Sequence, residues 1–188
     1  RLYCYKNNIF KSYKAPVPVI VVGNLTVGGT GKTPLVIYLA QLLQQQGLKP
    51  GIVLRGYKSK SIGAILVQKN TDPYLVGDEA VLLARRTGCP VVVARQRALG
   101  VQKLLKIHEI NIILCDDGLQ HYALQRDLEI AVIDGERMFG NGHCLPMGPL
   151  REFPQRLFQV DLTIVNGTDM KLMNSEIYGL INKRTVAM

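Results

Sequence analysis

Apolar residues occur in short runs along this chain, and within most runs they are continuous rather than alternating with polar residues. Seven runs have the length of a strand: Val17–Val22, Gly51–Leu54, Ala64–Val67, Pro90–Ala94, Asn111–Cys115, Leu128–Ile133 and Leu162–Val165. Continuous apolar runs are typical of strands covered on both faces, as in a parallel sheet. The pattern therefore predicts a mostly parallel sheet with helices on its faces.

Helical periodicity fills many of the intervals between these runs. Three stripes of apolar residues recur every three or four positions: Leu35, Leu39, Leu42 and Leu43; Ala80, Leu83 and Ala84; Ala98, Val101, Leu104 and Leu105. Gly47 is placed to end the first of these helices. Strands that alternate with helices predict an α/β fold with right-handed crossovers.

Three segments depart from this alternation. Residues Lys58–Pro73 predict a loop or a hairpin, and Met170–Ile181 form a last helix-like stretch. Residues Gly135–Gln155 hold four Gly and three Pro with little periodicity, which indicates a long functional loop. No apolar run reaches the roughly 18 residues that a membrane span needs. The first residues also lack the apolar centre of a signal peptide.

Positive charge is concentrated in the first part of the chain. The net charge is +9, yet residues 1 to 71 contain ten Lys and Arg and no Asp or Glu. Such a segment attracts phosphate, nucleic acid or anionic lipid. The alternative is that the excess lysines only aid solubility. The four cysteines lack metal-binding spacing, so we expect reduced thiols, with Cys89 and Cys115 buried.

The stretch "VVGNLTVGGTGKTPLV", residues 21–36, is the most informative motif. A strand, a glycine-rich turn and a helix that opens with Lys-Thr together form a phosphate-binding loop. The expected nucleotide-binding residues are Thr26, Val27, Gly28, Gly29, Thr30, Gly31, Lys32 and Thr33. Lys32 would reach the β- and γ-phosphates, and the Thr33 hydroxyl would bind Mg²⁺. The first glycine of the usual pattern is replaced by Thr26, and the alternative is a tight turn with a chance lysine.

Acidic residues supply candidates for the metal site. In "INIILCDDGLQHY", residues 110–122, an apolar run ends in Asp116 and Asp117, where a phosphate-loop enzyme places its metal-binding carboxylates. Either residue alone could instead cap the following turn. Asp78 and Glu79 open a predicted helix, where capping is the simplest role for Asp. His121 follows the acid pair and is either functional or structural.

These motifs together resemble the tetraacyldisaccharide 4′-kinase family, the lipid A kinases of Gram-negative bacteria. The resemblance rests on "APVPVIVVGNLTVGGTGKTPLV", "GIVLRGY", "VGDEAVLLARR", "DDGLQHYALQRDLEIAVIDGERMFGNG" and "LPMGPLRE", which cover about residues 10 to 168 in order. It implies a peripheral enzyme at the cytoplasmic face of the inner membrane. Such an enzyme uses ATP and Mg²⁺ to phosphorylate the 4′-hydroxyl of a tetraacylated glucosamine disaccharide 1-phosphate.

The resemblance also assigns roles to individual residues. It implies that Asp78 activates the acceptor hydroxyl, and that Lys32 stabilises the transferring phosphate. It implies metal binding for the set Thr33, Asp116, Asp117 and Glu79. Weaker candidates for contacts with the acceptor are His121, Arg151 and Glu152.

The resemblance implies a particular domain organisation. We expect residues 1–16 to be the remnant of a membrane-interface helix, because Leu2, Tyr5, Ile9 and Tyr13 recur at helical spacing among basic residues. Residues 17–168 would form the phosphate-loop kinase domain. Residues 169–188 would begin an incomplete, smaller α/β domain or a linker. Family members extend further at both ends, so we expect this chain to bind nucleotide and Mg²⁺ but to turn over poorly alone.

Other functions fit parts of the pattern. A partition-type or metal-chaperone ATPase switch would have an early lysine in the loop, where this chain has Val27. A GTPase would have N-K-x-D after a late strand, and Asn166-Gly167-Thr168-Asp169 lacks the lysine. A nucleic-acid-binding module would need stacking aromatics or a basic recognition helix, and neither is evident, so nucleic acid is not an expected partner. The sequence leaves the oligomeric state open.

Overall fold

The computed structural model describes residues 4, 5, 7, 9–55, 63–167 and 185–187. Its centre is one eight-stranded sheet in the order β3-β4-β2-β5-β1-β6-β7-β8. The strands are β1 (Val19–Gly23), β2 (Pro50–Leu54), β3 (Ile65–Val67), β4 (Val91–Val93), β5 (Ile112–Asp116), β6 (Leu128–Asp134), β7 (Leu162–Asn166) and β8 (Thr185–Ala187). All neighbours are parallel except β3 and β4. The α/β fold expected from the apolar runs is confirmed.

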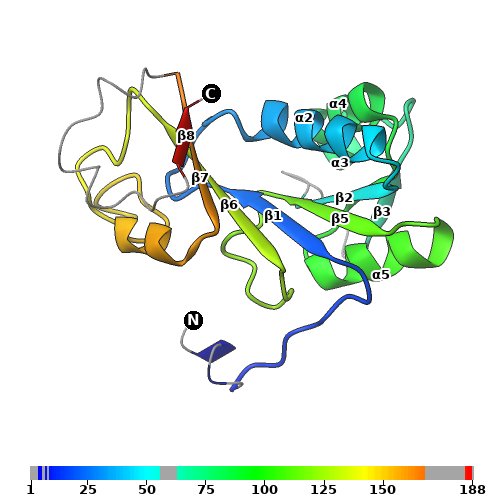
Figure 1. Ribbon diagram of the computed structural model, residues 1–188, viewed down its shortest axis with the longest axis horizontal. Helices are drawn as coiled ribbons and strands as arrows, with labels where there is room; N and C mark the ends of the chain where they lie inside the picture. The colour runs from blue at the N-terminus through cyan, green and yellow to red at the C-terminus, as the bar shows by residue number, and fades with distance from the viewer. Residues whose placement is uncertain (1–3, 6, 8, 56–62, 168–184, 188) are drawn as a thin grey trace.

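Helices cover both faces of this sheet. Helices α2 (Lys32–Gln45), α3 (Pro73–Val76) and α4 (Asp78–Thr87) lie on one face, and α5 (Arg97–Ile107) lies on the other (Figure 1). Two apolar clusters fill the two spaces between sheet and helices. All five residues of β2 and of β5 are buried, which is why these runs are continuously apolar rather than alternating.

Parallel pairing brings the carboxyl ends of the central strands together. β1 lies between β5 and β6, and its Val22 pairs with Asp116. On the other side, Asp134 at the end of β6 pairs with Asn166 at the end of β7. Since loops that follow parallel strands meet at one edge of the sheet, the segment after β1 is flanked by residues from three other strand ends.

The ends of the chain depart from the simplest expectation. Of the described residues before β1, only Cys4 and Tyr5 are helical, and Tyr13 forms a parallel bridge with Leu124. A helix that continues through Ile9 to Tyr13 is therefore wrong, because Tyr13 is held by backbone hydrogen bonds to residues 123 and 125. At the other end, β8 joins the same sheet beside β7. The expected helix at 170–181 lies outside the described residues.

Two further segments differ in detail from the pattern. Part of the expected loop or hairpin at 58–73 forms β3, which pairs antiparallel with β4, and α3 begins at its end.

Across the part of the chain that the structure describes, no helix is both long enough and apolar enough to cross a bilayer.

The long segment 135–155 is attached to the loop after β1 rather than free of it. The amide of Val27 donates to the Pro149 carbonyl at 2.8 Å, and the amide of Arg151 donates to the Leu25 carbonyl at 2.6 Å. Thr26 and Leu150 form an antiparallel bridge. These backbone bonds align the two loops side by side at the carboxyl edge.

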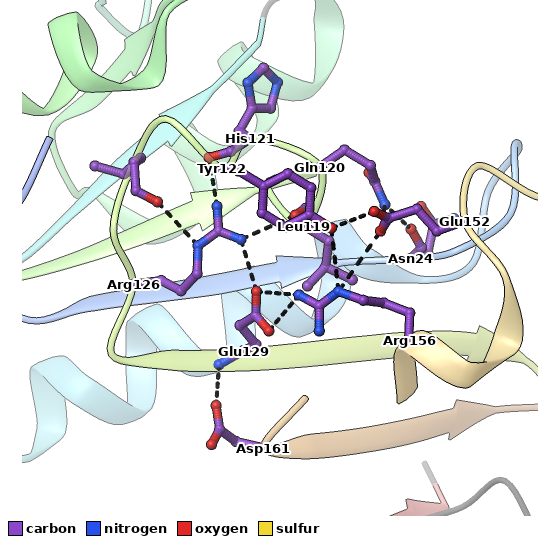
Figure 2. Close-up of polar contacts among 11 residues, drawn as sticks. Asn24, Leu119, Gln120, His121, Tyr122, Arg126, Glu129, Glu152, Arg156 and Asp161 are labelled. Atoms are coloured by element: carbon purple, nitrogen blue, oxygen red, sulfur yellow. Dashed lines mark hydrogen bonds and ion pairs between the residues drawn. The ribbon is translucent and has the colours of Figure 1, made fainter. Parts of the chain in front are cut away.

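A buried polar network holds the residues after this segment against β6 (Figure 2). Arg156, in the 3₁₀-helix η1 (Pro154–Gln159), donates to both carboxylate oxygens of Glu129 at 2.6 Å. Arg126 donates to the same carboxylate at 2.8 Å. Glu152 accepts from Tyr122 and from Gln120, so the network reaches the turn after β5.

Loss of the Glu129 carboxylate should cost more than loss of an exposed one. Glu129→Gln leaves two guanidinium groups without their buried partner, and breaking a buried pair in this way costs about 3–5 kcal/mol. Glu109→Gln, which removes the exposed pair with Lys49, should cost far less, because water already screens that pair. Urea unfolding of both variants measures the two free energies, and equal losses would contradict this account.

Candidate functional site

A cavity of about 860 Å³ opens at the carboxyl edge of the sheet. The phosphate-binding loop, the starts of α2, α3 and α4 and the turn after β5 surround it. Its lining includes Gly28–Thr33, Arg55, Tyr74, Asp78, Glu79, Asp116, Asp117 and Arg151. Most of the residues expected from the sequence to act together are therefore neighbours in one space.

The loop between β1 and α2 has the geometry of a phosphate cradle. Gly28 and Gly31 have φ values of 102° and 84°, which lie in the region that favours glycine. Helix α2 begins at Lys32, so its first-turn amides and the positive end of its dipole face the same region as the loop. A loop of this kind is suited to an anion with several oxygens.

Asp116 is the most deeply buried acid of the site. The residue is 3% exposed, and its Oδ1 atom has no hydrogen-bond partner among the described residues. Burial raises the pKa of this carboxyl to about 6, with further increases from Glu79 and Asp117 against opposing effects of Lys32 and Arg97. A buried carboxylate oxygen without a protein partner is compatible with a cation, a ligand donor or a water at this position.

Asp117 has the opposite balance of charges. Burial alone would raise its pKa, but Lys32, Arg151 and Arg97 lower it overall. The Arg151 Nη1 atom donates to both carboxylate oxygens, at 2.8 and 2.9 Å, and Lys32 Nζ lies 3.6 Å from Oδ1. Asp117 also has a φ of 49°, which turns the chain sharply after β5. It is therefore ionised and already paired with cations.

Asp78 and Glu79 reach the cavity from another element. Gly77, with φ at 90°, precedes them, and they form the first turn of α4. Negative side chains in a first turn interact favourably with the helix dipole. The structure brings this helix start to the same cavity as Lys32 and Asp116, so capping and a role in the cavity are compatible.

Arg97 is a site residue that the sequence did not reveal. It opens α5, is 2% exposed, and donates to the Asp116 carbonyl at 2.9 Å and the Ala94 carbonyl at 3.0 Å. Its charge opposes the rise in the pKa of Asp116 and helps to lower the pKa of Asp117. No local motif marks it, because the contact depends on how the start of α5 meets the end of β5 in the folded sheet. Arg55 and Tyr74, which line the cavity, were also missed, because the tertiary structure alone brings the end of β2 and the start of α3 to it.

Four expected residues are not brought to the cavity. Thr26 and Val27 bind the 135–155 segment through their backbone instead. The Glu152 carboxylate turns to Tyr122 and Gln120. The His121 carbonyl accepts from Arg126 at 2.5 Å, and Figure 2 shows its imidazole directed away from this network. The cavity lining contains none of the four.

The residues present fit a cation that is shared with a phosphate ligand. Within the described residues, no group of three or more His, Cys, Asp and Glu could hold a metal by itself. Mg²⁺ typically keeps several waters and is held by one or two carboxylates together with substrate phosphates. The Thr33 hydroxyl position and the partnerless oxygen of Asp116 suit this arrangement.

Comparison with known proteins agrees with the site. The profile of the family described as tetraacyldisaccharide-1-P 4′-kinase matches residues 1–187. The chain is 56% identical over 168 residues to a tetraacyldisaccharide 4′-kinase of Nitrosococcus oceani, covering 89% of this chain and 50% of the relative. A relative with the same name from Tolumonas auensis is 55% identical over 168 residues, covering 89% of this chain and 52% of the relative.

Solved structures give the same result. The chain superposes on the crystal structure of LpxK from Aquifex aeolicus in complex with ATP with a TM-score of 0.82 and 32% identity, covering 98% of this chain and 58% of that one. The hydrogenase maturation factor HypB of Archaeoglobus fulgidus, at 13% identity and a TM-score of 0.54, shares the fold alone, covering 92% of this chain and 81% of that one. The chain spans about half the length of the curated relatives it matches. By sequence profile, relatives and structure, this chain belongs to the tetraacyldisaccharide-1-P 4′-kinase family.

Proposed function

We propose that this chain is the nucleotide-binding part of a lipid kinase. The kinase would transfer the γ-phosphate of ATP to the 4′-hydroxyl of a tetraacylated disaccharide 1-phosphate. The observation that carries the proposal is the single cavity that joins the phosphate-binding loop, Lys32 and two acid pairs. Membership of the family supports the substrate class. Membership of this family does not favour the alternative of a partition- or chaperone-type ATPase switch.

The cavity assigns separate tasks to its acids. Asp116 would hold Mg²⁺ together with the Thr33 hydroxyl, because one Asp116 oxygen has no protein partner. Asp117 would act through its cationic partners Lys32 and Arg151 or through water. Glu79 would contribute charge rather than a direct contact. Bound Mg²⁺ supplies charge neutralisation for the phosphate oxygens.

Phosphoryl transfer depends mainly on alignment and on charge stabilisation. The amides of the loop would orient the phosphates, and Lys32 would stabilise charge that develops on the transferring group. Asp78, which lines the cavity from the first turn of α4, would accept the proton of the 4′-hydroxyl. Of the three residues expected to contact the acceptor substrate, Arg151 remains the best candidate, because it lines the cavity while Glu152 and His121 do not.

The membrane surface would be the second partner. Ile9 and Phe10 are 61% and 47% exposed, and the basic residues Lys11 and Lys14 follow them. Exposed apolar side chains beside lysines favour an anionic bilayer surface. We infer a peripheral position at the cytoplasmic face of the inner membrane, where the acylated acceptor would be presented.

Phosphoryl transfer should require both this chain and the part of its relatives' length that it does not match. A fusion of this chain to the remaining half of the Nitrosococcus oceani relative should phosphorylate the tetraacylated disaccharide 1-phosphate, and the chain alone should not. In the fusion, Asp78→Asn should lower kcat by about 10²- to 10⁴-fold through loss of the proton acceptor, with little change in ATP affinity. Radiolabelled ATP and thin-layer chromatography measure the product. Unchanged kcat in Asp78→Asn would exclude this role.

Asp116 should make stability depend on pH. Its pKa in the folded chain, about 6, exceeds the ordinary value of 3.8, so its stabilising contribution is complete below about pH 4 and is lost as the pH rises through 6. An asparagine at position 116 does not titrate. The free energy of unfolding of Asp116→Asn, relative to that of the unmodified chain, should therefore rise by about 3 kcal/mol between about pH 4 and pH 7.5. Urea unfolding in metal-free buffer measures this difference. A stability difference for Asp116→Asn that stays constant with pH would contradict the proposed burial cost.

The membrane contact should combine charge and apolar insertion. The chain should sediment with vesicles that contain anionic phosphatidylglycerol, and increasing salt should weaken this binding because exposed charges are screened. The double variant Ile9→Ser with Phe10→Ser should bind about tenfold more weakly. Leu99→Ser removes a similarly exposed apolar group from α5 and should change nothing. Equal binding to neutral vesicles would argue against the anionic surface.

A further inference from the structure

Three consecutive carbonyl groups of the phosphate-binding loop each accept a hydrogen bond from a side chain. The Gly28 carbonyl accepts from Asn24 Nδ2 at 3.5 Å. The Gly29 carbonyl accepts from Arg137 Nη2, and the Thr30 carbonyl accepts from Asn166 Nδ2 at 3.4 Å. The family motif around Arg137 and the N-x-x-D stretch at Asn166 otherwise have no part in the proposed chemistry.

The three donors come from three different strand ends. Asn24 directly follows β1, Arg137 follows β6, and Asn166 ends β7. Asp134, the register partner of Asn166, accepts from Arg137 Nε at 2.9 Å and fixes the guanidinium. The parallel order of β1, β6 and β7 is therefore what gathers these donors beside one loop.

The donors pack directly against the loop. A Cβ atom at Gly31 would collide with the Asn166 amide, and one at Gly28 would lie 3.1 Å from Arg137 Nη1. Glycine is favoured at position 31 by the Asn166 amide as well as by its positive φ, and at position 28 mainly by its positive φ. The loop and its donors are thus shaped to each other.

Holding a carbonyl also orients the next amide. A trans peptide group is planar, so the C=O of one residue and the N–H of the next point in opposite directions. When the carbonyls of residues 28 to 30 are turned to their donors, the amides of Gly29, Thr30 and Gly31 are turned away. These three residues line the cavity, and among the described residues their amides have no protein acceptor, unlike that of Val27.

We propose that Asn24, Arg137 and Asn166 form a carbonyl clamp, a set of positioning residues that presets the phosphate-binding amides. The clamp rests on the proposed binding of nucleotide in this cavity. Donors that are already oriented need no reorganisation when an anion arrives, which strengthens binding. The clamp would act on the phosphates of the ligand and not on its base.

Calorimetry with two probes, Mg·ATP and inorganic tripolyphosphate, tests the clamp. Asn166→Leu keeps the approximate side-chain shape and removes the donor without a change of charge. It should weaken the binding of both probes by the same factor, about tenfold. Arg137→Met should do the same, and Arg137→Lys should recover part of the affinity. Arg86→Met, on the exposed surface of α4, controls for loss of one positive charge and should retain full affinity.

Amide signals separate positioning from general loosening of the fold. In ¹⁵N–¹H spectra of the unmodified chain, tripolyphosphate should shift the amides of Gly29, Thr30 and Gly31. In Asn166→Leu these shifts should be reduced at equal probe saturation, while the melting temperature changes little. Unchanged affinity in Asn166→Leu and Arg137→Met would overturn the clamp, as would a loss confined to ATP, which would indicate contact with the nucleoside.

The outcome for the clamp is distinguishable from that for the kinase. If the unmodified chain binds both probes and the clamp variants bind them about tenfold more weakly, but the fusion fails to phosphorylate the lipid, the clamp stands and the proposed reaction falls. If the fusion is active and the variants bind normally, the reaction stands and the clamp falls. If the unmodified chain binds neither probe, both are wrong.

Discussion

A loop that binds phosphate through its backbone must leave its own amides without protein partners, and this constraint governs the carboxyl edge of the sheet. A short glycine-rich loop cannot hold several peptide groups in one orientation by itself, since glycine restricts the backbone least. In this chain the restriction comes from outside the loop. Side chains from the ends of β1, β6 and β7 hold the carbonyls, and the 135–155 segment pairs with residues 25–27. The order of the strands therefore determines whether the loop can function.

The acids around the cavity pose a second, electrostatic constraint. Four carboxylates line one space, and their mutual repulsion would oppose folding without nearby cations. Lys32 and Arg151 neutralise Asp117. Arg97 donates a hydrogen bond to the Asp116 carbonyl and so holds the end of β5. Among these four acids, only Asp116 has a buried side-chain oxygen that lacks a hydrogen-bond partner within the described residues. Of the two adjacent acids, Asp117 is therefore neutralised by side chains of the protein, and Asp116 is the one at which a cation would be bound.

The polar network around Glu129 connects this edge to the rest of the molecule. Glu152 lies between Arg151, which reaches the cavity, and the buried pair of Arg156 with Glu129. Tyr122 belongs to the same network, and its ring lies 6.3 Å from that of Tyr5 in the N-terminal segment. The segment proposed to meet the membrane and the segment that carries Arg151 therefore contact the same side chain. Glu152 is better understood as a support of the loop than as a ligand of the acceptor.

The sequence by itself determined the local features: the buried strands, the main helices, the phosphate-binding loop and the acid pair after β5. These are encoded by neighbouring residues, because apolar runs, glycine turns and strand-end acids act over a few positions. The motifs also led to the correct family. The assignments of individual residues to metal and acceptor remain predictions.

Only the tertiary structure decided which distant side chains serve the loop. Arg97 contacts Asp116 across 19 positions, and Arg137 and Asn166 contact the loop across more than a hundred. The same holds for the inward direction of Glu152, the bridge of Tyr13 with Leu124 and the return of β8 to the sheet. Such contacts depend on strand order and register, which arise when the whole sheet assembles and which no short stretch of sequence encodes.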